Sequence, residues 1–502
     1  MRIKALLLVT AITLLAAFPF RPVTQAVSLA VHNSASSDSN SIEERIKLVE
    51  NGLLPQTVIK GQPDPKMNIA ERMAYYRVPG VSVAVINNGA IEWARGYGMT
   101  EAGSNAPVTA ETLFQAASIS KPVAAMGALY LVEKGKINLD EDVNLKLTSW
   151  KVPENEFTKE KKVTLRGLLS HSAGTTVHGF RGYASDEAVP TLLELLDGKK
   201  PANSAAIRVD IVPGTKWRYS GGGTSVSQRL VMDVTGKAYP KFMKEAVLDK
   251  IGMKNSTYEQ PLPKELHSRA AVGHRGDGKP VKGKWHTYPE MAAAGLWTTP
   301  SDLARFAIEI QKSRAGKSNK VLSKAMTEQM LTQQMGDYGL GVGVGGSGRA
   351  ATFAHGGSNE GFRCMMFAYA ETGQGAVVMT NSDNGSPLAN EILRSIAAVY
   401  GWPDYKVKER EVVKLDPAVY SSYVGEYTVM GMTVTITAEA GRLFVKARPF
   451  GADKVELFSE SETKYFVMED DVTISFVKDE SGKVAEMIVQ PPGQTIKGKK
   501  VK

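Results

Sequence analysis

The pattern of apolar residues changes near residue 405, and this change limits the possible folds more than any other feature of the chain. Before it, helical spacing alternates with strand-like runs, among them a hairpin pattern over residues 78–94. After it, short alternating runs are separated by turn residues, which is typical of a small barrel or sandwich. With 502 residues, the chain exceeds one ordinary domain. We expect an α+β domain over residues 42–404, a charged linker over 405–416 and an all-β barrel domain over 417–502.

The first domain is expected to contain an antiparallel sheet flanked by helices, together with a helical region. The hairpin begins the sheet, helical patterns dominate residues 188–335, and strand patterns return at 338–353 and 365–380. In the second domain, the alternating runs predict strands at residues 433–437, 442–446, 455–458, 464–467, 472–476 and 487–489.

Residues 1–30 have the outline of a secretory signal peptide. A short basic start precedes an apolar run, and small residues offer cleavage sites after Ala26 or Ala30. An uncleaved membrane anchor is the alternative, but the apolar run is short for a bilayer span. The polar segment 31–41 is expected to be flexible. We therefore expect an exported protein, periplasmic or extracellular, without a stable membrane anchor after cleavage.

Cysteine, histidine and charge content exclude several classes of function. Cys364 is the only cysteine, which excludes an intrachain disulfide and a cysteine-rich metal site and predicts a buried thiol. The seven histidines lack metal-ligand spacing, and we expect no metal or other cofactor. Loss of Arg2, Lys4 and Arg21 with the leader lowers the formal charge from +9 to +6, and the remaining lysines form no basic stripe. Nucleic acid is therefore not an expected partner.

Ser118 and Lys121 are the candidate nucleophile and base. Apolar residues at helical spacing predict a helix within residues 114–131, and Pro122 is tolerated only in its first turn. Ser118 is therefore expected at or just before the helix N-terminus, with Lys121 three residues later on the same side. A serine hydroxyl needs a base to become a nucleophile, and a helix N-terminus favours a developing oxyanion. Alone, this Ser-x-x-Lys motif is weak, because a capping serine followed by a surface lysine matches it equally.

Two other motifs carry candidate site residues. Tyr219 precedes Ser220 and three glycines, which predict an open loop where the backbone can approach a ligand. The phenol of Tyr219 would share the base role with Lys121. His355-Gly-Gly-Ser358 is expected to follow a strand over residues 351–354 and to offer a backbone donor to a substrate. The alternatives are a tyrosine packed beside a flexible loop and a plain glycine turn with a solvated histidine.

In their order and spacing, these three motifs resemble those of the serine β-lactamase and penicillin-binding protein family. The resemblance is greatest to its class C-like branch, which includes secreted esterases and D-amino-acid peptidases. Three further stretches share it: Val78–Ile86, Leu168–Thr175 and Ala294–Phe306. It covers about residues 42–402, and residues 417–500 resemble the lipocalin-like β domain often appended in this branch.

The resemblance implies a β-lactamase/transpeptidase-like catalytic domain that acts through an acyl-enzyme on Ser118. Lys121 and Tyr219 would carry the proton out and back, and the backbone N–H groups of Ser118 and Ser358 would form the oxyanion hole. His355 and Gly357 would border the substrate together with Ser358. The expected partner is a small-molecule or peptide substrate, for which the cell wall is one source. The oligomeric state is left open.

The chain departs from the family pattern at two of these positions. The family's Tyr-x-Asn is Tyr219-Ser-Gly221 here, and the lysine of the third motif is His355. We therefore expect small esters or D-amino-acyl peptides as substrates in preference to β-lactams. A histidine with an ordinary pKa of about 6.5 would also make carboxylate-bearing substrates pH-dependent. The alternatives are a β-lactamase, a D-Ala-D-Ala carboxypeptidase, and a non-catalytic penicillin-binding or cell-wall sensor protein.

Other enzyme classes have weaker signals. Residues 341–346 match a dinucleotide fingerprint, but a strand-like run follows where that motif requires a helix. Gly-x-Ser-x-Gly does not occur, which argues against an α/β-hydrolase esterase. His-Glu-x-x-His is also absent, which argues against a zinc hydrolase.

Overall fold

The computed structural model describes residues 34–403, 405–447, 454–491 and 494–501. By its internal contacts the chain divides into residues 1–41 and residues 42–502. The predicted signal peptide, residues 1–30, lies outside the described residues. Helix α1 (Ser34–Glu50) begins inside the segment 31–41. Among the described helices, none is long and apolar enough to cross a membrane.

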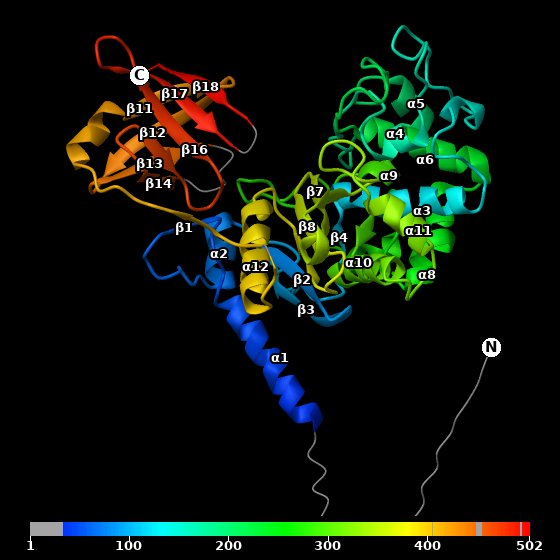
Figure 1. The fold of residues 1–502 in the computed structure, drawn as a ribbon, viewed down its shortest axis with the longest axis horizontal. Coiled ribbons are helices and arrows are strands. Elements are labelled where there is room, and N and C mark those ends of the chain that lie inside the picture. Colours follow the sequence, from blue (N-terminus) through cyan, green and yellow to red (C-terminus); the bar gives the residue numbers. More distant parts are fainter. Residues whose placement is uncertain (1–33, 404, 448–453, 492–493, 502) are drawn as a thin grey trace, which may run out of the picture. The chain divides into compact units, whose positions relative to one another are not determined.

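An antiparallel sheet organises the first domain, as predicted (Figure 1). Its strand order is β3-β2-β9-β8-β7-β6, and each neighbouring pair is antiparallel. The strands are β2 (Gly80–Asn87), β3 (Ala90–Gly98), β6 (Gly343–Gly345), β7 (Thr352–Asn359), β8 (Phe362–Tyr369) and β9 (Gly375–Thr380). The hairpin β2–β3 turns at Asn88 and Gly89, both with positive φ, as an Asn-Gly turn requires.

Alternation along β2 sends apolar side chains to both faces of the sheet. Val81, Val83 and Val85 join one apolar cluster, whereas Ala84 and Ile86 join another. The first cluster is covered by α2 (Ile69–Tyr76) and α12 (Gly385–Val399), and the second by α10 (Pro300–Arg314). Figure 1 shows α12 and α10 on opposite faces of this sheet. The sheet is therefore buried on both faces, which explains the nearly continuous apolar run of β2.

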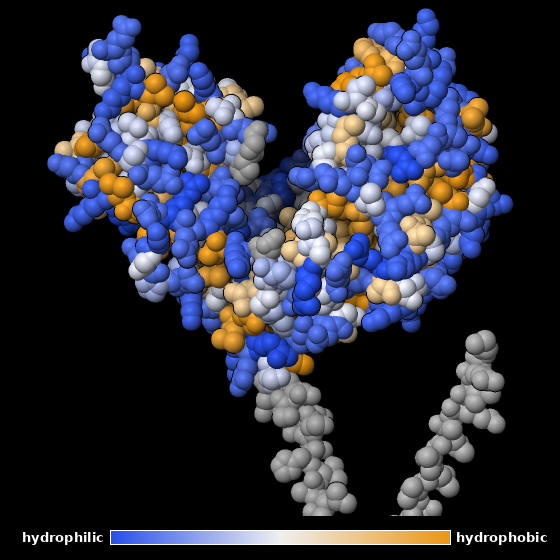
Figure 2. All heavy atoms as spheres, viewed as in Figure 1, coloured by the Kyte–Doolittle hydropathy of each residue, from blue (hydrophilic) through white to orange (hydrophobic). Residues whose placement is uncertain are grey.

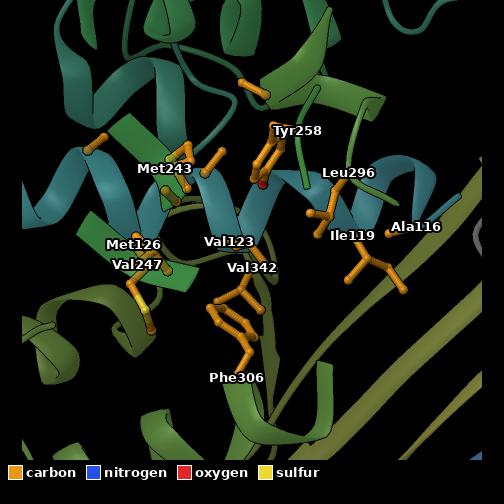
Figure 3. Packing of buried hydrophobic residues seen from close by; sticks show 14 of the residues in the cluster. Ala116, Ile119, Val123, Met126, Met243, Val247, Tyr258, Leu296, Phe306 and Val342 are labelled. Carbon is orange, nitrogen blue, oxygen red and sulfur yellow. The ribbon is translucent and has the colours of Figure 1, made fainter. Parts of the chain in front are cut away.

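The helical region contains α3 (Ser120–Glu133), which is buried on nearly all sides. Figure 3 shows its Val123 and Met126 among buried side chains that include Phe306 and Val342. A helix that is apolar all round belongs in a core. The other helices of this region are α4 (Leu165–Leu169), α5 (Leu192–Asp197), α6 (Gly221–Thr235), α7 (Tyr239–Met243), α8 (Asp249–Ile251), α9 (Met291–Ala294) and α11 (Lys324–Leu331).

The second domain is a closed eight-stranded barrel, which confirms the all-β prediction and decides between barrel and sandwich. Its strands are β11 (Gly425–Val429), β12 (Met432–Glu439), β13 (Arg442–Lys446), β14 (Val455–Ser459), β15 (Lys464–Phe466), β16 (Thr473–Lys478), β17 (Val484–Gln490) and β18 (Ile496–Lys500). Pairing between β11 and β18 closes the barrel. In the face drawn in Figure 2, hydrophilic residues cover most of the surface.

Two local predictions were wrong. The predicted strand over 338–353 is broken into the short β6 and the first two residues of β7, because Gly341 with positive φ and a 3₁₀ turn at Gly348–Ala350 interrupt it. The motif His355-Gly-Gly-Ser358 lies inside β7 rather than after a strand. The linker contains β10 (Lys408–Arg410), which pairs in parallel with β1 (Thr57–Ile59). Two further short strands, β4 (Phe114–Gln115) and β5 (Trp297–Thr298), pair beside the start of α3.

Candidate active site

Ser118 lies in a one-turn 3₁₀ helix, η1 (Ala117–Ile119), that leads directly into α3. This agrees with the predicted position at the helix start. Hydrogen bonds hold the turn on both sides: Ala116 N–H donates to Leu296 O at 2.8 Å, and the Tyr258 hydroxyl donates to Ser120 O at 2.7 Å. Ala117 has a φ of 50°, an unfavourable conformation for a residue with a Cβ. The turn is thus fixed in a strained geometry with Ser118 half-buried at its surface.

Lys121 is directed at Ser118, as the three-residue spacing predicted. Its Nζ donates to Ser118 Oγ at 3.0 Å and to Ala293 O at 2.8 Å. The residue is only 4% exposed, so the surface-lysine alternative is wrong. Two fixed acceptors hold the amine, and one of them is the hydroxyl it would have to deprotonate. This is the geometry that a general base needs.

The carbonyl of Ala293 belongs to α9, which is anchored to α6 through Gln228. Gln228 Nε2 donates to Pro289 O at 3.2 Å, and Gln228 Oε1 accepts from Ala292 N–H at 2.9 Å. Glu290, at the start of α9, is completely buried, and neither of its carboxyl oxygens has a hydrogen-bond partner. Burial raises the pKa of Glu290 to about 8. The carboxyl is therefore mainly neutral at pH 7, and α9 presents its backbone to Lys121 without an acidic charge.

Tyr219 meets the same amine from another side. Lys121 Nζ lies 5.0 Å from the centroid of the Tyr219 ring. The rings of His171 and His178 lie 4.3 Å and 4.9 Å from it, and that of Trp217 lies 6.4 Å away. The structure therefore brings Ser118, Lys121 and Tyr219 together from segments a hundred residues apart.

The glycines after Tyr219 are not the open loop that we predicted. Gly221, Gly222 and Gly223 form the first turn of α6, and Ser220 caps it by accepting from Gly223 N–H at 2.9 Å. Glycine is needed here because another chain segment approaches closely: a Cβ at Gly222 would lie 2.5 Å from Thr176 O. The three glycines in the sequence therefore reflect close packing of another backbone segment against the first turn of α6, and not an irregular loop.

His171 is a site residue that we did not assign, although Leu168–Thr175 was part of the family resemblance. Its Nδ1 accepts from Ser220 N–H at 3.2 Å, and its ring also lies 4.8 Å from that of Tyr338. Burial and the positive charge of Lys121 lower the pKa of His171 well below 6.5. The ring is thus neutral and fixes the backbone directly after Tyr219.

His355 is also buried and neutral, which makes our prediction of a pH-dependent charge wrong. Burial and the nearby charge of Lys121 lower the pKa of His355 to about 4. Its Nδ1–H donates to Gly356 O at 2.7 Å, so its Nε2 accepts from the Tyr338 hydroxyl at 2.9 Å. Burial also raises the pKa of Tyr338 well above 10, which keeps this hydroxyl protonated. Tyr338 was missed because its only signal was a tyrosine before a glycine-rich strand.

The strand β7 brings Gly357 and Ser358 beside the nucleophile. A Cβ at Gly357 would lie 2.3 Å from Ala116 O, so the strand passes directly against the residue that precedes η1. Asn359 fixes this contact from behind, where its Nδ2 donates to Gln115 Oε1 at 2.9 Å and to Ala294 O at 3.1 Å. Lys121, Tyr219, His355 and Gly357 therefore lie around the turn that carries Ser118.

No group of histidine, cysteine and acidic side chains in the described ranges could hold a metal ion. Cys364 is buried, as predicted, and its Sγ donates to Gln115 O at 3.2 Å. Burial raises the pKa of this thiol to about 12, so it remains protonated.

Comparison with known proteins identifies the class that the fold and these motifs define. The profile of the beta-lactamase family matches residues 66–400, and the chain belongs to this family. A domain of unknown function matches residues 409–500, the region of the barrel.

Two related proteins match different shares of the chain. Penicillin-binding protein 4* of Bacillus subtilis (strain 168) is 24% identical over 439 residues, which cover 80% of this chain and 90% of the relative. A beta-lactamase of Pseudomonas fluorescens is 28% identical over 249 residues, which cover 50% of this chain and 64% of the relative.

Solved structures share the fold at lower identity. An octameric penicillin-binding protein homologue from Pyrococcus abyssi has a TM-score of 0.60 at 21% identity, covering 86% of this chain and 98% of that one. The D-amino acid amidase of Ochrobactrum anthropi SV3 has a TM-score of 0.54 at 21% identity, covering 72% of this chain and 98% of the amidase.

Proposed function

We propose that the chain is a serine hydrolase that forms an acyl-enzyme on Ser118 and acts on small esters or D-amino-acyl substrates. One observation carries the proposal: the buried amine of Lys121 lies 3.0 Å from Ser118 Oγ and is held there by Ala293 O. Burial of a lysine and strain in the turn that carries its hydroxyl partner both lower the stability of the fold. Such strain persists mainly at functional sites, which supports a function for this pair.

The mechanism follows from the neighbours of this pair. Once its amine has released its extra proton, Lys121 takes the proton of Ser118 while Oγ attacks the substrate carbonyl. The backbone N–H groups of Ser118 and Ser358 stabilise the oxyanion that forms. Tyr219, beside the Lys121 amine, passes the proton to the leaving group, and water then releases the acyl group by the same steps in reverse.

The substrate preference rests on two features of the site. His355 is neutral and hydrogen-bonded on both ring nitrogens, so this position of β7 offers no fixed cation to a substrate carboxylate. Gly221 offers no side chain to hydrogen-bond a substrate amide. An ester that has neither a carboxylate nor an amide side chain loses no hydrogen bond or ion pair at such a site. A β-lactam would leave its carboxylate and amide unpaired. The name of the Ochrobactrum relative is consistent with the D-amino-acyl alternative.

We further propose that the protein is exported by cleavage of residues 1–30 and meets its substrate outside the cytoplasm. The basic and apolar composition of these residues supports this. Cell-wall fragments are one source of small D-amino-acyl substrates there. No nucleic acid or membrane lipid is part of the proposal.

A substrate panel tests the reaction. Hydrolysis of p-nitrophenyl esters, D-alanyl-D-alanine peptides and a chromogenic cephalosporin is measured for wild type and for Ser118→Ala. Ester or D-amino-acyl turnover is expected to exceed cephalosporin turnover, and loss of Ser118 to lower it by several powers of ten. Stable acylation by a penicillin without release would instead indicate a sensor, and faster cephalosporin turnover a β-lactamase.

A further inference from the structure

The space in front of Gly221 is occupied by an aromatic ring. A Cβ built at Gly221 would lie 3.0 Å from Cε2 of Phe180 and 3.2 Å from His178 O. Gly221 has an ordinary φ, so conformation does not require glycine there; a Cβ would instead be crowded by Phe180 and by His178 O. Gly221 is two residues after Tyr219 and begins α6. The ring of Phe180 therefore takes the place that a side chain at position 221 would have beside the candidate site.

The segment that carries Phe180 is fixed to the start of α6 by three hydrogen bonds. Gly221 N–H donates to His178 O at 3.0 Å, Gly222 N–H to Val177 O at 3.0 Å, and Ser220 Oγ to Thr176 O at 2.7 Å. Val177 has a φ of 63°, which is rare for a β-branched residue and persists only when its surroundings enforce it. The backbone over residues 176–178, which leads to Phe180, is thus held against the start of α6.

Aromatic side chains lie next to Tyr219 and, at Phe180, against Gly221. His178 and Trp217 are exposed although both rings lie within 6.4 Å of the Tyr219 ring, and Phe180 is half-buried. Exposed aromatic rings beside a nucleophile offer a substrate large apolar area. The phenylalanine ring has no group that could replace a hydrogen bond to an amide.

We infer that Phe180 is a specificity-determining residue: it forms the apolar wall of a subsite that accepts an aliphatic or aromatic substituent of the substrate and rejects an amide-bearing one. The inference rests on the proposed function and adds to it the chemistry of the substituent. An aliphatic group gains contact with the ring, whereas an amide would lose its hydrogen bonds to water without replacement.

The test compares isosteric substrates that differ only in polarity. Phenyl 4-methylpentanoate and phenyl N-acetylglycinate present nearly the same shape, one aliphatic and one with an amide. A second pair places the same difference in the leaving group, which distinguishes the acyl side from the leaving-group side. Values of kcat/KM are measured for wild type, Phe180→Ala, Phe180→Gln and Phe180→Leu. Phe458→Ala, in the barrel, controls for loss of any aromatic ring.

Wild type and Phe180→Leu are expected to prefer the aliphatic member of one pair by about tenfold or more, as for other apolar pockets. Phe180→Ala should reduce this preference to about threefold or less, and Phe180→Gln should favour the amide-bearing member. Phe458→Ala should leave the ratio unchanged. Labelling of Ser118 by a fluorophosphonate confirms that each variant is folded.

Two negative results have different meanings. If wild type hydrolyses none of the esters and Ser118 is not labelled, the proposed function itself is wrong. If wild type hydrolyses them but the preference in both pairs is the same in Phe180→Ala, Phe180→Gln and wild type, Phe180 does not contact the substituent and the inference is overturned.

Discussion

At the scale of single residues, the charge state of the site follows from burial. His171 and His355 are both neutral because burial and the nearby charge of Lys121 lower their pKa values. Glu290 is neutral at pH 7 for the corresponding reason, since burial raises the pKa of its carboxyl. The positive charge of Lys121 therefore has no ionised partner among these three buried groups.

The low pKa of His355 predicts loss of stability in acid. Between pH 6.5 and about 4, the unfolded chain binds a proton at this histidine and the folded chain does not, so falling pH favours unfolding. The full effect is about 3 kcal/mol in the free energy of unfolding. Urea unfolding of wild type and His355→Gln between pH 4 and 8 measures it. As pH falls, the free energy of unfolding of wild type should decrease relative to that of His355→Gln. Parallel plots of this free energy against pH for the two proteins would show that His355 titrates normally.

Residue-level prediction succeeded where partners are close in sequence. Ser118 and Lys121 are three residues apart, so helix geometry alone brought them together. The Tyr338–His355 hydrogen bond and the contact of Phe180 with Gly221 depend on the tertiary fold, and no local pattern encodes them. Burial of His355 was also invisible in the sequence, which is why its ordinary pKa was assumed.

At the scale of elements, the passage of β7 beside η1 determines the geometry around Ser118. We expected residues 355–358 to follow a strand over 351–354, with a plain glycine turn as the alternative, because glycine pairs are typical of turns. The structure keeps the strand straight through Asn359, and Gly357 is needed for close approach to Ala116 O. In the barrel, β11 and β18 were not predicted, since β18 is a lysine-rich segment whose strand pairing comes only from barrel closure.

The two glycines of β7 form a matched pair for a test. A Cβ at Gly357 would lie 2.3 Å from Ala116 O, whereas one at Gly356 would make only an ordinary contact at 3.6 Å with Met365. Gly357→Ala should push β7 away from Ser118 and lower kcat/KM by about 100-fold, as displacements near 1 Å can. Gly356→Ala should stay within about threefold of wild type. Equal activity of both folded variants would contradict the role assigned to this contact.

At the scale of the whole molecule, the two domains have separate apolar cores. The barrel cluster contains only residues between Leu415 and Ile496, and the clusters around the sheet end at Tyr405, as far as the structure describes the chain. The change of sequence pattern near residue 405 predicted this division because each domain buries its own alternating or helical apolar residues. The family match to residues 66–400 ends at nearly the same place.

Separate cores predict that the first domain folds without the barrel. A chain that ends at Glu411 keeps β10 and its pairing with β1. It should show one cooperative thermal transition and remain reactive toward a fluorophosphonate at Ser118, with altered substrate preference or assembly. Full-length protein and full-length Ser118→Ala are the controls. An aggregated or non-cooperative truncated chain would show that the barrel contributes to the core of the first domain.

The acyl-enzyme is the central claim, and rapid-quench mass spectrometry of Ser118 tests it most directly. Wild type is mixed with p-nitrophenyl acetate, quenched in acid within milliseconds to seconds and digested. The peptide that contains Ser118 should gain one acetyl group in step with a burst of p-nitrophenol close to one equivalent per active site. Ser118→Ala should show neither the burst nor the adduct. Turnover with no modified Ser118 peptide, or an undiminished burst from Ser118→Ala, would contradict the account.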